Sequence, residues 1–237
     1  LNKYRLKIMK TLITLSLAAI AASASAAVSA SDCVSPVSLE YQVTSQGNTK
    51  EIAIHRAGRE VVREDLTTGV VEYWYHSPAG RLKLIRYVDS EKHGIEYQAE
   101  DFRGNEDRVW QEISLAVPAD VRDSMTLVSK QGSGCELVET WESEAQKEKL
   151  VWLPAQQIVV SYENPVLAWS LTEQGDSGLQ QRLVSRDDYT LIDFADIGDS
   201  EENPFVKKMI NWGFVEHGAS GFYDEHGHAI EGHGHAH

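Results

Sequence analysis

The chain has 237 residues, and its 36 acidic side chains outnumber its 22 Lys and Arg, which gives a net charge of −14. This balance argues against nucleic acid as a partner, because a protein that binds nucleic acid presents a basic face. The 42% of hydrophobic and 24% of charged residues are typical of a globular protein. Two cysteines are too few for a disulfide-dense scaffold or a four-cysteine zinc site.

Residues 1–26 have the order of a secretory signal peptide. Basic residues precede an apolar run over 12–22, and Ala-Ser-Ala at 24–26 predicts the cleavage site. We expect translation to start at Met9. No later stretch is apolar for the roughly 20 residues that a membrane-spanning helix needs. The mature protein is therefore predicted to be periplasmic or secreted, with no integral membrane span.

In an oxidising compartment, Cys33 and Cys135 are expected to form a disulfide. The bond would close a loop of about 100 residues and stabilise the fold by up to ~4 to 5 kcal/mol in the chain-entropy model. Two free thiols are the alternative that the sequence leaves open.

The body of the chain alternates apolar and polar residues in short runs that turn signals separate. This pattern, rich in β-branched and aromatic residues, predicts antiparallel strands. The predicted strands cover residues 39–43, 52–54, 70–75, 82–88, 95–97, 125–128, 137–141, 150–153, 158–162, 166–171 and 183–185.

Two short helices are predicted among these strands, at 105–114 and 203–213. The second has clear end signals, because Asn203 can cap it, Pro204 suits its first position and Gly213 stops it. Its large apolar residues recur at i, i+4 and i+7, so one face is expected to pack on the sheet.

We therefore predict a single, mainly β domain over residues 27–216. Its antiparallel meander is expected to form a curved sheet or half-barrel with one or two short helices packed on it. From residue 217 the chain becomes rich in Gly and His and loses its periodicity, so 217–237 is predicted to be a flexible, disordered tail.

The tail contains six of the nine histidines. Neutral imidazole is a common ligand of zinc, copper and nickel. In an extended segment, His-x-His pairs place two imidazoles on the same side of the chain. Zinc is the expected metal, with copper and nickel as alternatives. The predicted metal ligands are His217, His226, His228, His233, His235, His237, Asp224 and Glu225.

Other polar and aromatic groups have simpler interpretations. The acidic residues within 193–202 offer oxygen ligands for calcium, but they lack the spacing of a calcium loop and are interpreted as a solvated turn before a helix. His55, His76 and His93 are interpreted as surface or half-buried strand residues. The aromatic run at 73–75 predicts sheet packing, with the wall of an apolar ligand cavity as the alternative.

Three segments, at 41–65, 70–88 and 134–163, repeat a strand, a turn and a strand that carries the next charge–aromatic pair. On this pattern, residues 38–172 resemble the lipoprotein-carrier group of bacterial envelope proteins (LolA-like). The resemblance implies an unclosed barrel with helices over its mouth and a lipid or another apolar ligand on its concave face. The His-rich tail is no part of that pattern.

These observations predict a periplasmic or secreted binding protein. The chain lacks the nucleophile-elbow, zinc-protease, Walker and dinucleotide motifs, which favours a non-enzymatic function. The leading hypothesis is that the His-rich tail binds a divalent transition metal. The alternatives are a carrier of lipid or another apolar ligand, and an envelope interaction protein without a small ligand.

Overall fold

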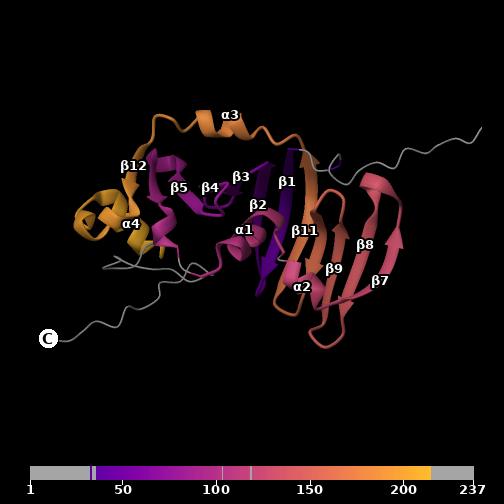
Figure 1. Cartoon of the computed structure of the whole chain (residues 1–237). Coiled ribbons are helices and arrows are strands. Elements are labelled where there is room, and N and C mark those ends of the chain that lie inside the picture. The colour runs from indigo at the N-terminus through magenta and orange to yellow at the C-terminus, as the bar shows by residue number, and fades with distance from the viewer. Residues whose placement is uncertain (1–32, 34–35, 103, 118, 215–237) are drawn as a thin grey trace, which may run out of the picture.

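The described part of the chain forms an open sheet of 12 strands with short helices on both faces (Figure 1). The computed structural model describes residues 33, 36–102, 104–117 and 119–214. The predicted signal peptide and the His-rich tail lie outside these residues. Among the residues that are described, no helix is both long enough and apolar enough to cross a membrane.

The strands, α-helices and 3-10 helices of the described residues have the following bounds. The strands are β1 (Val37–Ser45), β2 (Asn48–Ala57), β3 (Glu60–Asp65), β4 (Val70–His76), β5 (Leu82–Val88), β6 (His93–Tyr97), β7 (Thr126–Gln131), β8 (Val138–Ser143), β9 (Glu148–Leu153), β10 (Ile158–Glu163), β11 (Leu167–Gly175) and β12 (Thr190–Asp193). The helices are α1 (Glu106–Leu115), α2 (Ala119–Asp123), α3 (Leu179–Val184), α4 (Pro204–Asn211), η2 (Asp89–Glu91), η3 (Ala99–Asp101), η4 (Gly134–Glu136), η5 (Phe194–Asp196) and η6 (Gly198–Ser200).

The strand order is β12-β6-β5-β4-β3-β2-β1-β11-β10-β9-β8-β7. Strands β1 to β6 follow one another from the middle of the sheet towards one edge. Strands β7 to β11 return from the other edge, so that β11 pairs with β1. The pairs are antiparallel except that of β12 with β6, which is parallel. The prediction of a mainly β meander that does not close is confirmed.

One face of the sheet carries the main hydrophobic core, and we call it the core face. On β1, alternate residues such as Leu39, Tyr41 and Val43 are buried on this face. Ile113 of α1 and Met209 of α4 pack against the same cluster. Figure 1 shows α1 and α2 in front of the sheet and α4 beside β12. The helices therefore shield the apolar face of the open sheet from water.

Both predicted helices are confirmed by α1 and α4. The Asn105 side chain accepts a hydrogen bond from the backbone N–H of Arg108 at 3.1 Å and caps α1. The Asn203 side chain accepts from the backbone N–H of Phe205 at 2.9 Å and caps α4. Gly213 follows α4 with φ of 74°, in the left-handed region that glycine adopts without a steric cost.

The opposite face of the sheet is partly covered by α3, which lies in the connection from β11 to β12 (Figure 1). Leu179 of α3 packs with Val62 and Tyr87 in a second, smaller apolar cluster. Arg182 donates through Nη1 to both carboxylate oxygens of Glu64, at 3.0 and 3.1 Å. Apolar contact and an ion pair together hold α3 on this face.

The strand predicted at 183–185 is wrong, because Leu183 and Val184 lie in α3. Leu179 and Leu183 are four residues apart and both join the second apolar cluster. That spacing is helical, since side chains at i and i+4 share one face of a helix. Strands β3 and β12 were not among the predicted strands.

His55 on β2 is fully buried, and neither ring nitrogen has a hydrogen-bond partner among the described residues. Its interpretation as a surface or half-buried residue is wrong, because its side of β2 is the face that α3 covers. Its Cα partner on β3 is Val62, which packs against α3. Burial lowers the pKa of His55 to about 4, and the charges of Arg182 and Arg186 lower this pKa as well.

We expect the fold to lose stability as the pH drops from about 6.5 to about 4. In this range the unfolded chain protonates His55 and the folded chain does not, so the free energy of unfolding should drop by about 2 kcal/mol from pH 7.5 to pH 5. Urea unfolding of the wild type and of His55→Leu at both pH values measures this difference. If the variant loses as much stability as the wild type, His55 is not the cause.

Candidate ligand-binding site

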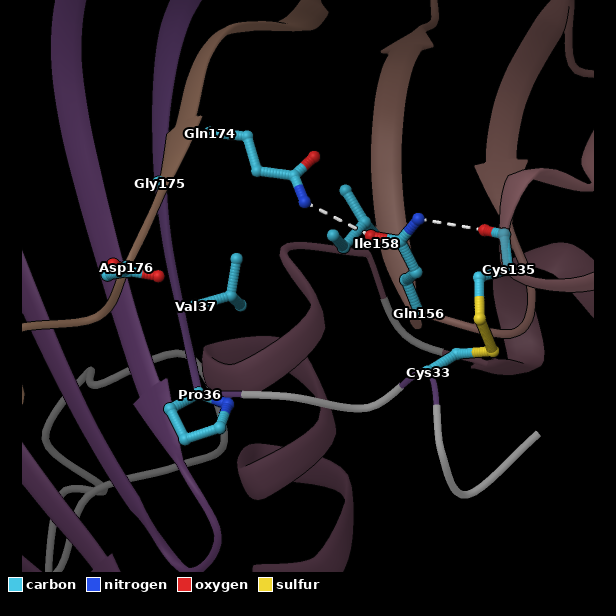
Figure 2. Close-up of a pocket in the computed structure, with 9 residues that line it drawn as sticks. All are labelled: Cys33, Pro36, Val37, Cys135, Gln156, Ile158, Gln174, Gly175 and Asp176. Carbon is cyan, nitrogen blue, oxygen red and sulfur yellow. Dashed lines mark hydrogen bonds between the residues drawn. A yellow bond between two sulfur atoms is a disulfide. The ribbon is translucent and has the colours of Figure 1, made fainter. Parts of the chain in front are cut away.

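A cleft of about 610 Å³ opens on the core face at one end of the sheet (Figure 2). It lies where β1 begins, β11 ends and β10 begins. Its volume falls within the 300–1,000 Å³ of typical small-molecule sites. The cleft is lined by Cys33, Pro36, Val37, Cys135, Gln156, Ile158, Gln174, Gly175 and Asp176.

The predicted disulfide between Cys33 and Cys135 is confirmed and borders this cleft. It joins the segment before β1 to η4, which lies between β7 and β8, and the two cysteines are 102 residues apart in the sequence. Because the bond connects the first strand to the far meander, it fixes one wall of the cleft covalently.

Two glutamine side chains form a hydrogen-bonded chain across the cleft (Figure 2). Gln174 of β11 donates through Nε2 to Oε1 of Gln156, at 3.1 Å. Gln156, in the turn between β9 and β10, donates through Nε2 to the carbonyl oxygen of Cys135, at 2.8 Å. Both amides are neutral, so this part of the wall offers polar contacts without charge.

The floor of the cleft is apolar and continuous with the main core. Val37 and Ile158 line the cleft and also belong to the core cluster. Gln174 pairs with Leu39 across β1 and β11, so its side chain lies on the core face as well. The exposed carboxylate of Asp176 stands at the rim. The cleft therefore combines an apolar floor with polar groups at its mouth.

Arg56 stands beside the cleft and connects three parts of the chain. Its Nη1 donates to the carbonyl oxygens of Ser114 at 3.0 Å and Gln157 at 2.8 Å, and its Nη2 donates to the carbonyl oxygen of Gln156 at 3.1 Å. Burial lowers the pKa of Arg56, and the nearby Tyr41 opposes this shift. The guanidinium fixes the C-terminal turn of α1 and the β9–β10 turn against β2.

A smaller cavity of about 190 Å³ adjoins Arg56 on its other side. It lies between α1 and strands β2 and β3, and shares Pro36 with the larger cleft. Trp110 and Leu115 of α1 and Val61 of β3 give it apolar walls. The core face is thus accessible on both sides of the Arg56 side chain.

None of the predicted metal ligands, His217, His226, His228, His233, His235, His237, Asp224 and Glu225, is among the described residues. The described part of the chain has no group of three or more His, Cys, Asp or Glu side chains arranged to hold a metal. Within the acidic turn, the Asp193 side chain instead accepts a hydrogen bond from the backbone N–H of Ala195, at 2.9 Å, and caps η5.

The aromatic run on β4 packs as predicted. Trp74 is buried on the core face, whereas Tyr73 contacts the second cluster on the opposite face. Sequence reasoning missed Gln156, Gln174 and Arg56, because nothing in the spacing of single Gln and Arg residues indicates that distant segments bring them together.

Comparison of the chain with protein-family models and with curated proteins gives no match. The resemblance to lipoprotein carriers therefore stays a prediction. The candidate site rests on the geometry of the cleft alone.

We expect Arg56→Met to lower the free energy of unfolding by roughly 2 to 4 kcal/mol, because three carbonyl groups lose a charged donor. Arg59 of the same hairpin is a matched control. It is exposed and donates to the carbonyl oxygens of His76 and Ser77. Arg59→Met should lower the free energy of unfolding by about 0.5 kcal/mol or less. Equal losses in urea unfolding would contradict a special role of Arg56.

Proposed function

We propose that the protein is a non-enzymatic binding protein of the periplasm or extracellular space that holds a small apolar or amphipathic molecule on its core face. The observation that carries this proposal is the cleft of about 610 Å³, whose floor is part of the hydrophobic core. A ligand that enters there buries its apolar part against Val37 and Ile158. Its polar part meets the two glutamine amides and Asp176 at the mouth.

The energetics favour a ligand of this kind. Each Å² of apolar surface removed from water contributes about 25 cal/mol, so the apolar part of a ligand gains affinity when it leaves water for the cleft. A polar group at its end finds amide donors and acceptors and keeps its hydrogen bonds. The amide chain is preformed, which limits the entropy lost on binding. The resemblance to lipoprotein carriers points to the same class of ligand.

A substitution at the mouth of the cleft tests the proposal. Gln174→Trp places a bulky side chain where Gln174 extends across the cleft, whereas Glu173→Trp puts the same group at the next residue of β11. Successive strand residues point to opposite faces, so only the first variant should obstruct the core face. We expect Gln174→Trp to weaken binding of the apolar fluorescent probe N-phenyl-1-naphthylamine by about tenfold, or ~1.4 kcal/mol.

Glu173→Trp should bind the probe as the wild type does, and thermal unfolding should show that both variants are folded. If both variants bind the probe as the wild type does, the cleft is not the binding site of the probe. A wild-type protein that binds no apolar probe, and that carries only protein partners when it is isolated, would favour the interaction protein without a small ligand.

The histidine-rich segment 217–237 supports a second function, the binding of a divalent transition metal. Its His-x-His pairs at 226/228, 233/235 and 235/237 are the observation that favours it. Zinc is the first candidate, with copper and nickel as alternatives. The segment lies outside the described residues, so this proposal rests on the sequence and is independent of the cleft.

We expect zinc binding by the full chain near pH 7.5, and its loss near pH 5, because ligation needs neutral imidazole and the unperturbed pKa of His is ~6.5. Deletion of 217–237 should abolish it. Native mass spectra of protein isolated without metal-affinity resin measure the bound metal directly. Metal that persists at the lower pH, or after the deletion, would rule out the histidine segment as the site.

A further inference from the structure

A second opening lies on the core face at the end of the strands opposite to the cleft. It is a cavity of about 190 Å³ between the start of β2, the end of β3 and the start of β4. This volume is below that of a complete small-molecule site, so it suits one group of a larger ligand. The cavity is lined by Lys50, Ile52, Arg63, Asp65, Val70 and Glu72.

The charged lining residues balance, but Arg86, which lies outside the lining, pairs with Glu72 and so leaves one positive charge in excess. Nζ of Lys50 lies 3.6 Å from Oδ2 of Asp65. The carboxylate of Glu72 accepts two hydrogen bonds from Arg86, at 3.0 and 3.1 Å. These contacts form two neutral pairs. The guanidinium of Arg63 remains as a third cation.

The side chain of Arg63 has no hydrogen bond and no ion pair with any described residue, although Arg63 is half-buried. Its guanidinium carbon lies 5.6 Å from the centroid of the Trp169 ring. Arg63 and Arg86 stand opposite Glu72 on either side. Burial raises the pKa of this carboxyl, but the charges of Arg86 and Arg63 help to hold it below its usual value. Two guanidinium groups thus share one carboxylate, and all five N–H donors of Arg63 lack an acceptor within the described chain.

The second meander of the sheet contains the same arrangement without the excess charge. Glu139 on β8 faces Lys130 on β7, and their Oε1 and Nζ atoms are 2.7 Å apart. On its other side Glu139 faces Trp152, where Glu72 faces Arg86. There the carboxylate of Glu139 pairs with a single cation, Lys130. Arg122 also lies over the rings of Trp141 and Trp152, but it pairs with Asp123, so among the described residues of the two meanders Arg63 differs in having no carboxylate of its own.

We infer that Arg63, supported by Lys50, binds the anionic head group of an amphiphile at this second opening, which is a site separate from the cleft. A carboxylate or phosphate supplies the paired acceptors that the fork of a guanidinium matches. Ile52 and Val70 give the cavity apolar walls against which the first carbons of the ligand pack. The site goes beyond the proposed function, because the two openings share no lining residue, and it favours an anionic amphiphile, such as a long-chain carboxylate or a lipid phosphate, over a neutral one.

Calorimetric titration with dodecanoate and with the neutral dodecanol tests the inference, since the two ligands differ only in their head group, and N-phenyl-1-naphthylamine serves as the probe of the separate cleft. We expect the wild type to prefer dodecanoate by about tenfold or more, and Arg63→Gln to lose this preference while it still binds the probe. Arg63→Lys keeps the charge and should retain part of it. Arg59→Gln, in the same hairpin, is the matched control and should behave as the wild type.

A preference for dodecanoate that survives in Arg63→Gln would overturn the inference. The inference would also be overturned if the wild type bound the two ligands equally and bound no inorganic phosphate. Phosphate binding that Arg63→Gln abolishes would support an anion site that a free anion also occupies. If no apolar probe binds at all, the proposed function fails, and the phosphate titration still decides on the anion site.

Discussion

The guanidinium of Arg56 is the contact on which the rest of the arrangement depends. From β2 it reaches the carbonyl groups of Ser114, Gln156 and Gln157, which lie far from it in the sequence. Burial of a cation is costly, and three carbonyl acceptors offset that cost. The carbonyl of Ser114 also lies at the negative end of α1, which favours a cation. One side chain thereby holds the helical cover and both meanders together.

The position of the cleft follows from this contact and from the disulfide. Arg56 fixes the backbone of the β9–β10 turn, and the side chain of Gln156 in that turn then reaches the carbonyl group of Cys135. The Cys33–Cys135 bond attaches the same region to the start of β1. Because both constraints act at one end of the sheet, the core face can remain open there without loss of the fold. At the opposite end of the sheet, charge pairs between neighbouring strands line the second opening. The two openings therefore differ in chemistry.

Local signals in the sequence were enough for some elements and too weak for others. Asn203, Pro204 and Gly213 act on the backbone next to them, so α4 was predictable with its ends. The apolar residues at 183 and 184 alone do not separate a short strand from a short helix, and the helical spacing from Leu179 to Leu183 becomes evident only from their shared contact with the second cluster. The burial of His55 could not be predicted either, because it depends on α3, a segment that joins the sheet from far along the chain. The pairing of β1 with β11 has the same non-local origin.

The sequence nevertheless contains a repeated element whose meaning emerges only from the strand register. Val-Glu-Tyr-Trp at 71–74 and Val-Glu-Thr-Trp at 138–141 each place a carboxylate two residues before an indole that donates to it, at 3.2 and 3.1 Å. Each Trp then faces a Leu on the next strand, and that Leu faces a Tyr on the one after. The two meanders are therefore equivalent in packing and differ in charge, since Arg86 stands where the second meander has Trp152. Because Arg86 pairs with Glu72 in the first meander, Arg63, the counterpart of Lys130, is left without a carboxylate of its own among the described residues.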